Sequence, residues 1–123
     1  MRAILTLLLL LSAASASAEW IESGESTSAI SYVDPDTMER IGHVRRFWAI
    51  QEMKETTPSG VMSIRALEEY DCAGAKFRYL SISAHSGPMA GGQILLADSL
   101  NDDWSYIPPG RSPSALQRIV CAP

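Results

Sequence analysis

Two histidines, His43 and His85, are the side chains best suited to act as a general base in this serine-rich chain. A serine nucleophile needs a histidine within hydrogen-bonding reach, and the sequence contains no Gly-x-Ser-x-Gly motif. We therefore expect both histidines to lie in loops or at strand ends, and we predict no catalytic residue. A small hydrolase, with one histidine beside a carboxylate in a deep pocket, is the alternative.

Pairs of carboxylates are the second group of residues that could take part in catalysis. Glu68 and Glu69 are adjacent, so in a strand they point to opposite faces. A glycosidase needs two carboxylates about 5 to 10 Å apart across a sugar-sized cleft, and a domain of this size has little room for one. We expect Glu68 and Glu69 to be solvated at the edge of a sheet.

The signals for metal or phosphate binding are weaker still. The acidic run from Asp98 to Asp103 lacks the alternate ligands and the glycine of an EF-hand loop. Gly87, Gly91 and Gly92 are not followed by the Lys-Ser or Lys-Thr pair of a phosphate-binding loop. We predict no metal ion and no cofactor.

The two cysteines, Cys72 and Cys121, predict a structural bond. An even number of cysteines in an exported chain indicates a disulfide. On the chain-entropy account, closing a loop of about 50 residues stabilises the fold by about 4 kcal/mol. A zinc site is the alternative, but two thiolates without a Cys-x-x-Cys motif or a nearby histidine cluster are poor zinc ligands.

The N-terminal residues predict export. Arg2 precedes an apolar run from Leu7 to Leu11, and a small-x-small ending follows at residues 16–18. This order is typical of a cleaved signal peptide. The apolar run is shorter than the roughly 20 residues that a transmembrane helix needs. We expect residues 1–18 to be removed, which leaves residues 19–123 as one domain in the periplasm or outside the cell.

The mature part has the composition of an acidic domain. Nine of the 10 Lys and Arg residues remain once Arg2 is lost, against 14 Asp and Glu residues. This surplus of acidic side chains gives no electrostatic basis for binding nucleic acid. No later segment is apolar enough to span a membrane, and residue 19 is not the cysteine that a lipid anchor requires. We therefore expect neither a membrane span nor a lipid anchor.

Glycine and proline interrupt the chain at short intervals, which is typical of a small antiparallel sheet. Val44–Met53 is the clearest strand, with apolar residues on both faces. Val61–Cys72 and Lys76–His85 each alternate in hydrophobicity and are joined by a short link, which predicts a hairpin. Further extended segments are predicted at Glu19–Glu25, Ile30–Val33, Gln93–Asp98 and Trp104–Ile107, with a helical turn at Thr37–Arg40.

The chain is predicted to end in a helix. Ser112 is placed as its N-cap and Pro113 as its first residue. Leu116, Ile119 and Val120 recur at helical spacing and form a buried stripe. A helix of about eight residues is marginal alone, so a disulfide at its end would fasten it to the sheet. The predicted fold class is α+β: a small single antiparallel sheet of about six strands, with a C-terminal helix tied to it by one disulfide.

Several short motifs occur in a fixed order along nearly the whole mature chain. They are Tyr32–Thr37, Val44–Ile50 with Trp48 inside it, Glu69–Cys72, Arg78 and Leu80, Trp104, Pro109-Gly110, and a final helix leading to Cys121. In this order the motifs resemble the surface-adhesin protein E family. The resemblance implies a small antiparallel sheet with a C-terminal helix held by one disulfide, which agrees with the fold predicted from the residues.

The resemblance also implies a function. The best-known adhesin of the family binds host matrix and serum proteins such as vitronectin and laminin, so the resemblance implies such a protein partner and a possible homodimer. The binding segment of that adhesin is the strand pair around the first cysteine, which here spans about Met62 to His85. Arg65, Lys76 and Arg78 then form the candidate partner-binding face. We expect a non-enzymatic binding module of the cell envelope with a protein partner.

Two departures from the family favour a different partner. The chain lacks a lipid-attachment cysteine, and Glu68, Glu69 and Asp71 offset the three cations of the candidate face. The alternative function is that of a soluble periplasmic protein, of a housekeeping or inhibitor-like type, which binds a bacterial protein.

Overall fold

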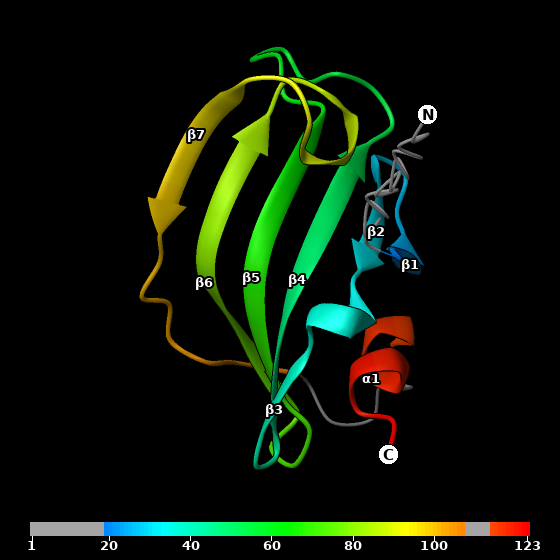
Figure 1. Ribbon diagram of the computed structural model, residues 1–123, viewed down its shortest axis with the longest axis vertical. Helices are drawn as coiled ribbons and strands as arrows, with labels where there is room; N and C mark the ends of the chain where they lie inside the picture. Colours follow the sequence, from blue (N-terminus) through cyan, green and yellow to red (C-terminus); the bar gives the residue numbers. More distant parts are fainter. Residues whose placement is uncertain (1–18, 108–113) are drawn as a thin grey trace, which may run out of the picture.

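The computed structural model describes residues 19–107 and 114–123. In this part of the chain one sheet of eight strands has the order β1-β2-β4-β5-β6-β7, with β3 paired to β4 and β8 paired to β6. Figure 1 shows β4 to β7 side by side, while β1, β2 and the helix α1 lie to one side of them. The predicted α+β architecture is confirmed. The sheet has eight strands rather than about six: β3, with three residues, was not predicted, and β8, with two, lies in the predicted extended segment Trp104–Ile107.

The observed strand limits follow the sequence pattern closely. Val44–Met53 is β4 and Lys76–His85 is β6, as predicted, and β6 forms the expected hairpin with β5, Ser63–Asp71. The other strands are β1 (Ile21–Glu25), β2 (Ala29–Val33), β3 (Glu39–Ile41), β7 (Ile94–Ser99) and β8 (Ser105–Tyr106). Two short 3-10 helices are η1 (Pro35–Thr37) and η2 (Pro88–Ala90), and α1 is Ala115–Val120.

The helical turn predicted at Thr37–Arg40 lies elsewhere. It begins at Pro35, because the Asp34 carboxylate accepts a hydrogen bond from the Asp36 amide at 3.0 Å and caps the turn there. Residues 39–41 form β3 instead and pair with the start of β4.

Cross-strand pairing assigns the side chains of the central strands to two faces. Directly paired residues point to the same face, so Arg46 of β4, Glu69 of β5 and Arg78 of β6 share one face. Their neighbours in sequence, such as Phe47 and Tyr70, point to the other face. We call the first the cationic face. The second, against which α1 packs, is the helix face.

The hydrophobic core lies on the helix face. Val33, Phe47, Tyr70 and Val120 are each only 1% exposed. Leu116 and Ile119 of α1 pack against this cluster, as their helical spacing predicts. Burying a large apolar side chain contributes about 1.5 to 3 kcal/mol, so packing holds a helix that would be marginal alone.

The start of α1 differs from the prediction. The Ser114 hydroxyl accepts a hydrogen bond from the Gln117 amide at 3.1 Å, so Ser114 is the N-cap and the helix begins at Ala115. The predicted cap, Ser112, and the predicted first helical residue, Pro113, lie outside the described residues. Both serines precede the apolar stripe, and the sequence pattern alone does not choose between them.

The end of α1 is fixed covalently. Cys121, the C-cap residue, is bonded to Cys72, which directly follows β5, and the chain has no free cysteine. The predicted disulfide is confirmed. It fastens the last helix to a central strand 49 residues earlier in the chain.

Candidate functional site

A row of charged side chains crosses the cationic face. Glu69 is only 3% exposed, and its two carboxylate oxygens bind different arginines, with Arg78 at 2.7 Å and Arg46 at 3.1 Å. Glu39 lies 3.8 Å from Arg46 at the outer end of the row. Two guanidinium groups thus compensate one buried carboxylate, which offsets much of the cost of removing it from water.

Trp104 lies over one end of this row. Its ring centroid is 4.4 Å from the Arg78 guanidinium carbon and 5.1 Å from the Lys76 ammonium nitrogen. Lys76 is also 3.8 Å from a carboxylate oxygen of Asp71. The hydrogen bond from the Gly74 amide, more than this lysine, holds the pKa of the Asp71 carboxyl below its usual value. Lys76 and Arg78 therefore both have acidic partners within the molecule, Asp71 and Glu69.

Arg65 has a different environment on the same face. Its guanidinium carbon lies 3.9 Å from the centroid of the half-buried Trp48 ring, and no carboxylate of the described residues forms an ion pair with it. A shallow hollow beside the pair is lined by Ser81, Ser83 and Asp98. Of the three cations predicted for the partner-binding face, Arg65 is the one that forms no ion pair with a carboxylate of the described residues.

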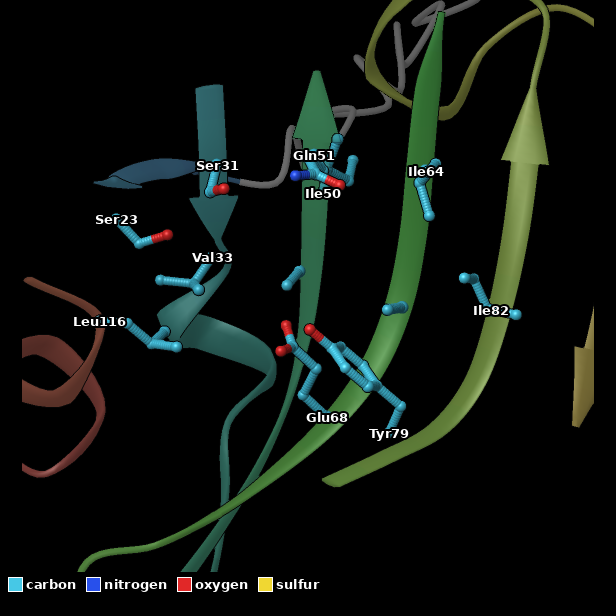
Figure 2. Close-up of a pocket in the computed structure, with 12 residues that line it drawn as sticks. Ser23, Ser31, Val33, Ile50, Gln51, Ile64, Glu68, Tyr79, Ile82 and Leu116 are labelled. Atoms are coloured by element: carbon cyan, nitrogen blue, oxygen red, sulfur yellow. The ribbon is translucent and has the colours of Figure 1, made fainter. Parts of the chain in front are cut away.

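The opposite, helix face carries a pocket of about 260 Å³ (Figure 2). Residues of β1, β2, β4, β5, β6 and α1 line it. Most of them are aliphatic: Val33, Ala49, Ile50, Ile64, Ala66, Ile82 and Leu116. The polar ones are Ser23, Ser31, Gln51, Glu68 and Tyr79.

Glu68 is the acidic residue of this pocket. Figure 2 shows its carboxyl group and the Tyr79 hydroxyl directed into the same end of the pocket. No hydrogen bond or ion pair joins Glu68 to another described residue, and burial raises the pKa of its carboxyl to about 7. Burial and then the neighbouring Glu68 also raise the pKa of Tyr79.

The expectation that Glu68 and Glu69 are solvated at a sheet edge is wrong for both residues. They do point to opposite faces, as adjacent strand residues must. However, β5 lies in the middle of the sheet between β4 and β6, so neither side chain is at an edge. Arginines cover Glu69 on one face, and the pocket surrounds Glu68 on the other.

The histidines lie where the sequence predicts, apart from each other. His43 is exposed in the turn before β4, and His85 is the last residue of β6. His85 is buried, and its Nε2 lies 2.7 Å from the Ser83 hydroxyl, while its Nδ1 has no hydrogen-bond partner. The described residues therefore assemble no relay of serine, histidine and carboxylate.

The described residues, 19–107 and 114–123, offer neither a cluster of metal-ligating side chains nor a long apolar helix. These residues contain no group of three or more His, Cys, Asp or Glu side chains placed to hold a metal ion. They also form no helix that is long and apolar enough to cross a membrane.

The family model described as surface-adhesin protein E matches residues 20–122. The chain belongs to the surface-adhesin protein E family. No curated protein sequence matches it. The family that the sequence motifs resemble is thus confirmed, and this member is a surface-adhesin-like module.

Solved structures of Haemophilus influenzae protein E resemble this fold. Crystal form II shares 13% identity and a TM-score of 0.54, over 81% of this chain and 91% of that chain. The selenomethionine form shares 14% identity and a TM-score of 0.55, over 81% and 90% of the two chains. At this level of identity, the likeness shows that this chain has the fold of protein E. It shows nothing about the ligand of this chain.

Proposed function

We propose that this protein E family member is a non-enzymatic binding module of the cell envelope, which contacts a protein partner through its cationic face. The observation that carries the proposal is the stack of Arg65 on Trp48. Arginine and tryptophan are enriched among residues that dominate binding energy at protein interfaces. Trp104, with Lys76 and Arg78 against its ring, extends this surface.

The partner proposed first is a host matrix protein such as vitronectin or laminin. Acidic segments of such a partner would be attracted to Arg65, because no carboxylate of the described residues forms an ion pair with it. A bacterial envelope protein is the alternative partner. The signal peptide that the sequence predicts at residues 1–18 supports export in either case, and digestion of the domain on intact cells would separate the cell surface from the periplasm.

The test is charge reversal at Arg65. The purified domain of residues 19–123, as Arg65→Glu, is expected to bind immobilised vitronectin or laminin at least about tenfold more weakly than the wild type. Arg78 is not suitable for this test, because its loss leaves Glu69 buried with a single arginine. Surface plasmon resonance measures the difference in affinity.

The matched control is Arg40→Glu, which reverses the same charge on β3, outside the cationic face. It is expected to leave binding unchanged. Equal binding by the wild type and a folded Arg65→Glu variant would exclude this face. If neither host protein binds, and a bacterial envelope protein is captured by the wild type and lost with Arg65→Glu, the same face serves the alternative partner.

A further inference from the structure

The pocket on the helix face contains a carboxyl group without a partner, in a lining that is mostly aliphatic. The charged groups Arg46, Arg65, Lys76 and Arg78 all lie on the opposite face of the sheet. Arg45 points to the helix face, but its guanidinium donates to the carbonyls of Gly42, in the turn before β4, and of Val44, the first residue of β4. Glu68 therefore meets no compensating cation within the described chain.

Such an arrangement costs stability, because a carboxylate in an apolar recess loses hydration and gains no partner in return. The Glu69 side chain, one residue later, shows the usual solution, with an arginine on each oxygen. An acid with a strongly perturbed pKa in a concave site is a candidate for function. A ligand with a cationic group would supply the partner that Glu68 lacks.

We propose that the helix-face pocket binds an aliphatic primary ammonium group, with Glu68 and Tyr79 as its polar contacts and the aliphatic walls around its methylene chain. A primary ammonium has three N–H donors, which match the carboxylate and hydroxyl oxygens at one end of the pocket (Figure 2). Ile64, Ile82 and Leu116 contribute the apolar surface that a methylene chain requires.

The size of the pocket limits the ligand. Sites for drug-sized molecules have volumes of roughly 300 to 1000 Å³, and this pocket, at about 260 Å³, is smaller. It suits a single short chain of the length of a lysine side chain. Two sources have this chemistry: a lysine side chain of a partner protein, and a small free alkylamine. The proposal does not depend on the cationic face, which lies on the other side of the sheet.

The experiment titrates the full domain of residues 19–123 with n-pentylammonium and with n-pentanol at about pH 8, where both Glu68 and the amine are charged. Chemical shifts of the methyl groups of Ile64 and Ile82 report on the pocket. Saturable shifts are expected with the ammonium, and binding of the neutral alcohol is expected to be at least about tenfold weaker. Equal binding of the two probes, or no saturable shift with the ammonium, would overturn the proposal.

Two variants and a control assign the site. Glu68→Gln keeps the shape and removes the charge, and it is expected to weaken ammonium binding at least about tenfold. Ala66→Leu fills the pocket while keeping Glu68, and it is expected to abolish binding. Glu55→Gln removes the same charge from an exposed position outside the pocket and should change nothing. Undiminished binding by Glu68→Gln would refute the assignment even if Ala66→Leu does not fold.

A further titration with Nα-acetyl-lysine N-methylamide separates the two sources. If it binds at least as tightly as n-pentylammonium, the pocket accepts a lysine side chain with its attached backbone. If the backbone groups prevent binding and n-pentylammonium still binds, the ligand is a free amine. Either result supports an ammonium site, and failure of both probes refutes it.

Discussion

At the scale of single residues, Glu68 and Glu69 show how position decides the behaviour of identical side chains. Glu69 is more completely buried, yet two arginines bind its carboxylate at 2.7 and 3.1 Å. Glu68 is only half-buried, but no cation lies beside it. Burial raises the pKa of its carboxyl group to about 7. The two residues therefore differ in electrostatic compensation: arginines bind the Glu69 carboxylate, and no cation binds the Glu68 carboxyl group.

The Glu68→Gln substitution is predicted to alter how stability depends on pH. Because the folded protein holds the Glu68 proton to about pH 7 and the unfolded chain releases it near 4.5, the folded state binds more protons between these values. The free energy of unfolding should therefore fall as pH rises from about 4.5 to 7, by up to about 3 kcal/mol for this residue. Glu68→Gln should match the wild type at pH 4 and exceed its stability at pH 8.

Urea denaturation of both proteins at pH 4, 6 and 8 measures this difference. Asp71, whose pKa is lowered, changes stability in the opposite direction, but it is present in both proteins and cancels in the comparison. Glu55→Gln serves as the control for loss of one exposed carboxylate and should parallel the wild type. A Glu68→Gln protein that is no more stable than wild type at pH 8 would contradict the prediction.

Residue patterns in the sequence predicted the disulfide and the positions of both histidines, because these depend on composition and on strand ends. They did not predict the environments of Glu68 and Glu69. Alternation shows that the two side chains point to opposite faces, but not what covers each face. That depends on which strands flank β5 and in which register, and this information is not local in the sequence.

At the scale of elements, strand register creates the charged row of the cationic face. The pairing of β4, β5 and β6 aligns Arg46, Glu69 and Arg78. The limits of β4 and β6 could be predicted from the alternation of their residues, and the existence of α1 from its apolar stripe. The short strand β3 could not be predicted, because its three exposed residues have no burial pattern and it forms only by pairing with β4.

This charged row allows a test of how burial changes the contribution of an ion pair to folding free energy. Arg78 lies 2.7 Å from a Glu69 side chain that is 4% exposed, whereas Lys54 lies 2.6 Å from a Glu25 side chain that is 54% exposed. Arg78→Met should cost about 2 to 4 kcal/mol of folding free energy, because it leaves a buried carboxylate with one arginine. Lys54→Met should cost less than about 1 kcal/mol, because water already screens that pair.

Thermal and urea unfolding of the two variants would measure these losses at one pH and salt concentration. The similar distances in the two pairs make burial the main variable. Equal losses would mean that Arg46 alone compensates Glu69. In that case Arg78 would be available to a binding partner in the same way as Arg65.

At the scale of the whole molecule, the sheet has two faces with different properties and one exposed edge. The cationic face presents arginine and tryptophan, and the helix face holds the core and the pocket. The edge strand β7 is exposed along its whole length. Ile94 and Leu96 on it are 65% and 58% exposed, and in the described chain no strand pairs with its outer side.

An exposed apolar edge strand is a template for pairing with another chain. Two copies of this domain can join β7 to β7 in antiparallel orientation about a twofold axis, which extends one sheet across both molecules. We predict that a homodimer forms in this way, because this pairing would bury apolar surface of Ile94, Leu95 and Leu96 and satisfy the unpaired backbone groups of β7. The two cationic faces remain accessible in such a dimer, so it would present two copies of the proposed binding surface.

Leu96→Lys is predicted to shift the protein to a monomer, because a charged lysine on an edge strand opposes pairing between copies. Sedimentation equilibrium at micromolar concentrations is expected to give a dimer for the wild type and a monomer for the variant. Ile41→Lys, which places the same charge on another exposed apolar position away from β7, should remain dimeric. A wild-type monomer would exclude this assembly, and a dimeric Leu96→Lys variant would move the interface away from β7. If the dimer forms through β7, avidity should make the wild type bind an immobilised partner more tightly than the monomeric variant, although both carry the same Arg65 and Trp48.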